Sequence, residues 1–89
     1  MIDRVEIEFE TGLPRDVLVG RLASAMHAGP FVMRDLVPAG TRRWSATCVL
    51  AEPAMAVGSG KVAELQYLLA REVDLIAVRS SPATPVAVT

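Results

Sequence analysis

The most constraining feature of this sequence is a strict alternation of apolar and acidic side chains close to its beginning. Residues 5–10 run Val-Glu-Ile-Glu-Phe-Glu. A period of two is typical of a β-strand, because successive side chains point to opposite faces of the sheet. Strands of parallel sheets are usually buried on both faces. A strand with one acidic face therefore predicts an antiparallel sheet that helices cover on one side only.

A helix is expected directly after this strand. Gly12 breaks the strand, and Pro14 suits the first turn of a helix, where its missing N–H group costs little. Apolar residues then recur at three- and four-residue spacing, as they do on the buried side of an amphipathic helix. Gly29 and Pro30 end this helix, which places His27 in its last turn.

The second half of the chain predicts a hairpin, a helix and a last strand. Residues 31–37 and 42–50 are rich in strand formers and enclose a turn at residues 38–40, as in a β-hairpin. A second amphipathic helix begins at Ser59, which is a favourable N-cap residue, and residues 73–79 supply the last strand.

This order predicts an α+β domain with a ferredoxin-like β-α-β-β-α-β sandwich, in which a four-stranded antiparallel sheet carries two helices on one face. Residues 1–79 then form a single domain, and residues 80–89 form a C-terminal tail in which residues 86–88 are able to pair as a short edge strand. The first and third strands of this topology are antiparallel neighbours. Their exposed faces bring together Glu6, Glu8 and Glu10 on one strand and Arg43, Ser45 and Thr47 on the other.

Charge and composition argue against several classes of partner. Nine basic and ten acidic residues give a formal net charge of −1, which provides no field to attract nucleic acid, and Trp44 alone is available as a stacking platform. No segment approaches the roughly 20 apolar residues that cross a bilayer, so we expect no membrane insertion. A single cysteine, Cys48, and an N-terminus without an apolar leader favour the cytoplasm.

The apolar content favours association with a second copy. Hydrophobic residues make up 52% of the 89 residues, and a chain this short exposes a large share of its surface even when it is folded. We therefore expect a homo-oligomer, most simply a dimer. The acidic face of the first strand is expected to be solvated or ion-paired rather than metal-binding, and no cofactor is expected.

The first candidate ligand-binding segment opens the second helix and consists of Gly58, Ser59, Gly60 and Lys61. A glycine-rich helix start offers unpaired backbone N–H groups to a phosphate or carboxylate. The segment resembles part of a P-loop, but Met55 replaces the first glycine and Val62 replaces the residue whose hydroxyl binds magnesium. The alternative is a flexible loop with an ordinary helix cap.

The second candidate is the connection between the first strand and the first helix, formed by Thr11, Gly12 and Leu13. Together with the helix that follows, Gly29 and residues 32–36, this connection resembles the opening of an ACT-type regulatory domain. The resemblance implies a β-α-β-β-α-β unit that pairs with a second copy and binds an amino acid or a similar small effector near this loop.

No nucleophile, base and orienting group can be identified together in the sequence. The leading expectation is therefore a non-catalytic, homodimeric domain that binds a small anionic or amino-acid effector or has a regulatory role. One alternative is a small dimeric ferredoxin-like enzyme of the oxygenase or isomerase type. Its pocket of several hundred Å³ between sheet and helices would be reached by Trp44, His27 or Cys48. The other alternative is a protein–protein assembly or inhibitor module.

Overall fold

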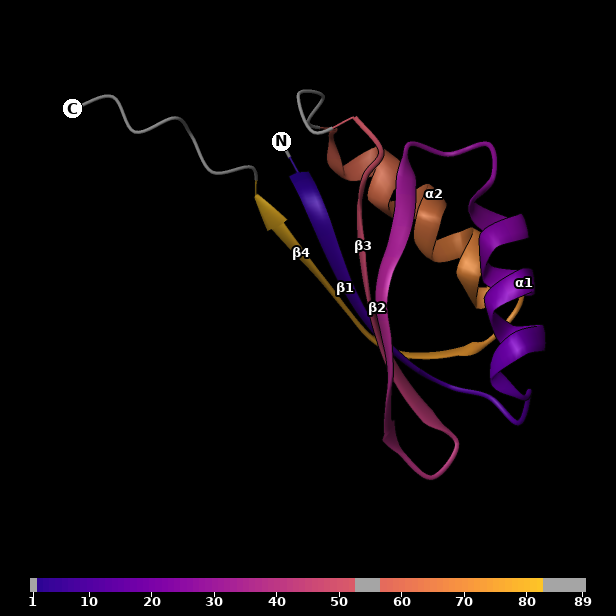
Figure 1. The fold of residues 1–89 in the computed structure, drawn as a ribbon. Coiled ribbons are helices and arrows are strands. Elements are labelled where there is room, and N and C mark those ends of the chain that lie inside the picture. Colours follow the sequence, from indigo (N-terminus) through magenta and orange to yellow (C-terminus); the bar gives the residue numbers. More distant parts are fainter. Residues whose placement is uncertain (1, 53–56, 83–89) are drawn as a thin grey trace.

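The computed structural model describes residues 2–52 and 57–82. Its elements are β1 (Ile2–Glu10), α1 (Arg15–Met26), β2 (Phe31–Gly40), β3 (Arg43–Leu50), α2 (Ser59–Ala70) and β4 (Asp74–Pro82). The four strands form one antiparallel sheet in the order β2-β3-β1-β4, and both helices lie on the same side of it (Figure 1). The predicted ferredoxin-like α+β sandwich is confirmed.

The alternation along β1 separates the two faces of the sheet. Val5, Ile7 and Phe9 are at most 2% exposed and point toward the helices. The core is completed mainly by Leu18, Leu22 and Met26 of α1, Val62, Leu65 and Leu69 of α2, and Ala46, Cys48 and Leu50 of β3. Aliphatic side chains dominate this core, as the composition predicts. No helix within the described residues is long and apolar enough to span a lipid bilayer.

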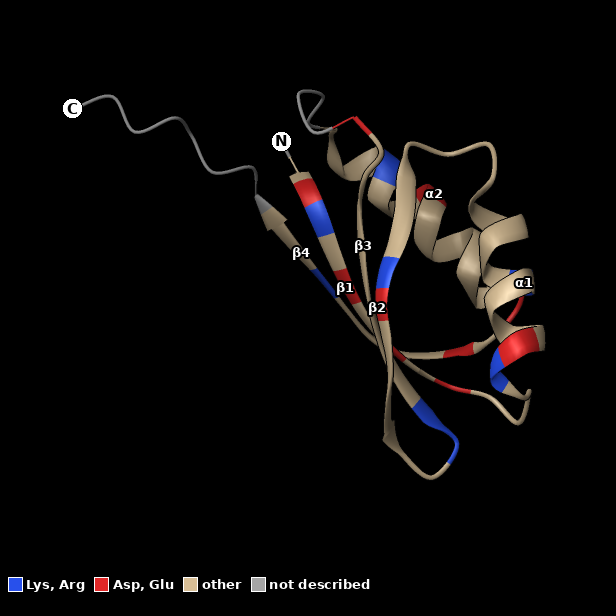
Figure 2. Ribbon diagram, in the orientation of Figure 1, with Lys and Arg blue, Asp and Glu red and all other residues tan. Residues whose placement is uncertain are grey.

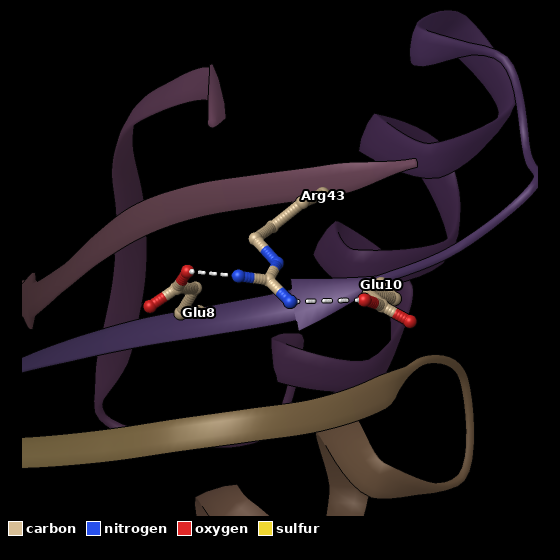
Figure 3. Close-up of polar contacts among 3 residues, drawn as sticks. All are labelled: Glu8, Glu10 and Arg43. Carbon is tan, nitrogen blue, oxygen red and sulfur yellow. Dashed lines mark hydrogen bonds and ion pairs between the residues drawn. The ribbon is translucent and has the colours of Figure 1, made fainter. Parts of the chain in front are cut away.

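The opposite face of the sheet carries the predicted cross-strand pairing. Residues Glu6, Glu8 and Glu10 of β1 lie opposite Thr47, Ser45 and Arg43 of β3. The guanidinium of Arg43 lies 3.2 Å from a carboxylate oxygen of Glu10 and 3.6 Å from one of Glu8 (Figure 3). These side chains are partly solvated, so each pair is worth under about 1 kcal/mol. The contact nevertheless confirms that β1 and β3 are antiparallel neighbours and that opposite charges meet across their exposed face.

The hairpin turn lies later in the chain than predicted. β2 continues through Pro38 to Gly40, and the chain reverses at Thr41 and Arg42. Proline is tolerated here because β2 is an edge strand, and an edge strand leaves one row of N–H groups unpaired. Gly40 and Arg42 both have positive φ values, of 153° and 61°. Glycine adopts a positive φ readily, so the conformation that the residue types do not indicate is that of Arg42.

Two further boundaries differ from the prediction. Gly58, rather than Ser59, is the N-cap of α2, and no side chain donates or accepts a capping hydrogen bond there. β4 extends to Pro82, so residues 80–82, predicted as the start of a tail, pair with the beginning of β1. The edge strand predicted at residues 86–88 lies outside the described residues.

Asp35 shapes β2 through a bulge. The pairing of β2 with β3 gains one extra residue between Arg34 and Val37, and Asp35 has a φ of 47°. This left-handed conformation is open to glycine and tolerated by aspartate, but it is costly for β-branched residues. We expect Asp35→Val to lower the free energy of unfolding by about 1–2 kcal/mol, and Asp35→Gly to maintain or raise it, in urea denaturation. Equal losses in both variants would show that the bulge is not strained.

Candidate ligand site

The two predicted ligand-binding segments lie at opposite ends of the sheet. Val57, just before Gly58, pairs with Ile2 at the beginning of β1. Thr11 follows the other end of the same nine-residue strand. At about 3.3 Å per residue, the two segments are roughly 30 Å apart. The seven predicted residues therefore belong to two separate places rather than to one site.

The β1–α1 connection is held against the tip of the β2–β3 hairpin. Thr11 is a buried polar residue whose backbone N–H donates to the carbonyl oxygen of Arg42 at 2.9 Å. Its Oγ1 accepts a hydrogen bond from the backbone N–H of Leu13 at 3.2 Å. The side chain of Leu13 packs against the core. These contacts fix the backbone on both sides of Gly12.

A recess of about 200 Å³ opens beside this loop, and we call it the polar recess. It is lined by Glu10, Thr11, Gly12, Arg42, Ala70, Arg71, Glu72, Val73 and Asp74. Three segments distant in sequence meet here: the end of β1, the hairpin tip, and the connection from α2 to β4. Figure 2 shows basic residues at the hairpin tip and acidic residues along the nearby strand ends. Thr11 and Gly12 are thus placed together in one recess.

Arg42 lies across the backbone of Gly12. A Cβ atom at Gly12 would sit 3.4 Å from both terminal nitrogens of Arg42 and 3.5 Å from its Cζ. Because these three distances are nearly equal, the flat guanidinium faces the glycine. The φ of Arg42, 61°, lies in the region where glycine is favoured. The hairpin turn thus holds the backbone of Arg42 in place, with its guanidinium over Gly12.

Two carboxylates of the polar recess are already engaged. Glu10 accepts a hydrogen bond from Arg43 at 3.2 Å. Glu72 forms an ion pair with Arg21 of α1 at 3.7 Å. Their negative charges are therefore largely offset within the chain.

The remaining charges are available to a ligand. Arg42, Arg71 and Asp74 form no ion pair with any other residue in the ranges 2–52 and 57–82. The guanidinium of Arg71 lies over the ring of Tyr67, 6.0 Å from its centroid, and the ring does not neutralise its charge. The recess thus offers two guanidinium groups and one carboxylate, an arrangement that suits a carboxylate-bearing molecule or a zwitterion.

The start of α2 is arranged as an ordinary helix end. The carbonyl oxygen of Gly58 accepts a hydrogen bond from the N–H of Lys61 at 3.1 Å. The Lys61 ammonium lies 3.6 Å from Glu64. A Cβ atom added at either Gly58 or Gly60 would meet open space. Anion binding at this helix start stays a prediction. The ammonium group of Lys61, which would contact the anion, already forms an ion pair with Glu64.

One of the three side chains of the enzyme alternative reaches a hollow of the expected size, and the other two do not. An apolar hollow of about 560 Å³ lies between α1 and β2, and His27 lines it, but Trp44 and Cys48 do not. Trp44 instead lies beneath the guanidinium of Arg15, 5.9 Å away. Cys48 is 0% exposed, and burial raises the pKa of its thiol from 9.0 to about 12. A thiol that stays protonated at neutral pH is not a nucleophile.

Sequence reasoning missed Arg42, Arg71 and Asp74. The sequence predicted that β1 and β3 are neighbours, but the register that pairs Glu10 with Arg43 and brings Arg42 to Thr11 is visible only in the structure. Arg71 and Asp74 follow a helix in an ordinary charged stretch, and only the folded chain brings them to the end of β1.

Comparisons with known proteins bear on the fold alone. No family model matches this chain, and no curated protein matches it in sequence. Its structure is similar to the crystal structure of TT0538 protein from Thermus thermophilus, with a TM-score of 0.80 at 12% sequence identity. The match covers 89% of this chain and 18% of that chain, so this chain spans less than a fifth of the Thermus protein. The likeness shows that this chain shares its fold with part of a longer protein.

Proposed function

We propose that this chain is a non-catalytic regulatory domain that acts as a homodimer and binds a small carboxylate-bearing effector, of the amino-acid class, in the polar recess. One observation carries the proposal. Arg42 is held at positive φ over Gly12, without an ion-pair partner among the described residues, in the same recess as Arg71 and Asp74.

The chemistry of the polar recess fits such an effector. A guanidinium donates paired N–H groups to a carboxylate in a fixed geometry, and Arg42 and Arg71 supply two of them. Asp74 is suited to an ammonium group on the same molecule. Gly12 has no side chain, so the guanidinium of Arg42 can lie flat against its backbone at the edge of the recess. The fold and the position of the loop agree with the resemblance to ACT-type regulatory domains, which is an argument by analogy.

Apolar side chains on the surface support association with a second copy. Within residues 2–52 and 57–82, the large hydrophobic residues that are more than 40% exposed are Val17, Val19, Val32, Val37, Tyr67 and Ile76. A chain of 89 residues that leaves so many aliphatic groups in water gains stability by covering some of them.

Thermal denaturation with amino acids and small mono- and dicarboxylates tests the ligand. A molecule that binds only the folded chain raises the melting temperature, by roughly several degrees once its concentration far exceeds the dissociation constant. Molecules without a carboxylate serve as controls. The proposal fails if no carboxylate raises the melting temperature above the shift that these controls give.

Arg42→Gly separates ligand binding from stability. Glycine relieves the positive φ and keeps the backbone carbonyl that Thr11 bonds, so the melting temperature without ligand is expected to stay or rise by roughly 4–8 °C. The ligand-induced shift should disappear, because the guanidinium is gone. Asp35→Gly is the matched control, since it relieves a positive φ at a residue that does not line the recess and should keep the full ligand shift. An unchanged ligand shift in Arg42→Gly would remove Arg42 from the site.

A further inference from the structure

β4 forms one open edge of the sheet. It pairs with β1 on one side, and no other described strand pairs with its outer side (Figure 1). The other edge, β2, is a poor partner for a second chain, because Pro38 lacks an N–H group and the charged residues Arg34 and Asp35 lie in the middle of the strand. Between Asp74 and Arg79, by contrast, β4 consists of four uncharged aliphatic residues. An edge-to-edge contact is therefore more favourable along β4 than along β2.

A bulge in β4 places two oppositely charged residues on the same face of the sheet. In its pairing with β1, Leu75 lies opposite Phe9 and Ala77 opposite Glu8, so Ile76 is an extra residue. Asp74 lies opposite Glu10 and Arg79 opposite Glu6. Because both glutamates point away from the helices, Asp74 and Arg79 share the open face of the sheet, although five positions separate them. In a regular strand that spacing would put them on opposite faces.

With Asp74 and Arg79 on the same face, β4 is complementary to a second copy of itself. In an antiparallel pair, residues opposite each other point to the same face. When two β4 strands pair about a two-fold axis normal to the sheet, Asp74 of each copy can lie opposite Arg79 of the other. Leu75 then faces Val78 on the helix side, and Ile76 faces Ala77. In this one register, opposite charges face each other and the paired residues lie on the same face of the sheet.

The exposure of these residues agrees with that arrangement. Ile76 is 45% exposed, whereas Leu75 and Val78 pack partly against the core of their own chain. Asp74 and Arg79 are exposed and form no ion pair with a described residue. Pairing through β4 would cover the isoleucine, satisfy the open row of backbone groups and join the two charges.

We propose that two copies of this chain associate by antiparallel pairing of their β4 strands, which gives one sheet running through both. The proposal rests on the homodimer of the proposed function and names its interface. Asp74 also lines the polar recess, so the interface adjoins the ligand site of each copy. A carboxylate has two oxygens and accepts hydrogen bonds from more than one donor, which allows Asp74 to serve both.

Charge reversal at each end of β4 tests the register. In a dimer of the Asp74→Arg variant, arginine faces arginine at both ends of the paired strands. In a dimer of the Arg79→Asp variant, aspartate faces aspartate at both ends. Each variant alone should dimerise with a dissociation constant raised at least about tenfold in sedimentation equilibrium without ligand. An equimolar mixture of the two variants should restore dimerisation. In a dimer with one copy of each variant, arginine faces aspartate at both ends of the paired strands. Circular dichroism and melting confirm that each variant is folded.

Arg34→Asp on the opposite edge is the matched control and should associate like the unaltered chain. The interface is overturned if both β4 variants dimerise normally, if their mixture does not recover, if Arg34→Asp alone disrupts the dimer, or if the unaltered chain is monomeric. Association is measured without effector, so a recess that binds no carboxylate leaves the dimer result standing. If the unaltered chain is monomeric but carboxylates still raise its melting temperature, the ligand site stands and the dimer interface fails.

Discussion

Phe9→Ala is expected to lower the free energy of unfolding by about 3–5 kcal/mol. Phe9 is 0% exposed and lies on β1, between β3 and β4 and under the helices. Protein interiors are closely packed, so removing the ring leaves a cavity that the neighbouring side chains cannot fill. Urea denaturation followed by circular dichroism measures the loss.

Glu8→Ala is the control for Phe9→Ala, because Glu8 adjoins Phe9 on the other face of the same strand. Its partly solvated contact with Arg43 predicts a loss below about 1 kcal/mol. Losses of similar size at the two positions would contradict the division of β1 into a buried and a solvated face.

Stability is expected to fall steeply at alkaline pH because of Cys48. Burial raises the pKa of its thiol from 9.0 to about 12, so the folded chain holds this proton more tightly than the unfolded chain. The resulting stability is fully present below pH 9.0 and is lost as the pH rises through about 12. The loss is on the order of 4 kcal/mol, a large part of the stability of a small domain.

Cys48→Ala isolates this effect from the titration of lysine and tyrosine. The difference in free energy of unfolding between the original chain and the variant should shrink between pH 9.0 and 12, and then change sign if the thiolate costs more than the cavity. A difference that is constant with pH would mean that the thiol is not buried in the folded chain.

The fold was predictable because its main determinant is local. The alternation of Val5, Ile7 and Phe9 with glutamates follows from the two-residue period of a strand and needs no knowledge of the rest of the chain. Once β1 has a buried face and a wet face, the order of the other elements leaves little freedom. That the glutamates of β1 lie beside Arg43 of β3 then followed from the topology.

The turn and the ends of the strands were less predictable because tertiary context decides them. Pro38 usually marks a turn, but an edge strand accommodates it. Arg42 adopts a conformation that its side chain disfavours, so no propensity could assign the reversal to it. The bulge at Ile76 is likewise visible only in the pairing of β4 with β1.

The candidate site was predictable only in part. The loop at Thr11 and Gly12 stands out in the sequence because a glycine follows a strand and precedes a helix. The charges that give the polar recess its chemistry come from Arg42, Arg71 and Asp74, which are far from that loop in sequence. The sequence treated this loop and the segment from Gly58 to Lys61 as two separate candidates, and the length of β1 keeps them apart.

Nuclear magnetic resonance of the ¹⁵N-labelled chain, titrated with amino acids and small carboxylates, tests the ligand site most directly. A chain of 89 residues gives a resolved amide signal for most positions. The account predicts that the signals of Thr11, Gly12, Arg42 and Arg71 shift together and saturate with one dissociation constant, while those of Gly58 and Lys61 stay in place. Shifts confined to the start of α2, or no saturable shift at the polar recess with any carboxylate, would contradict it.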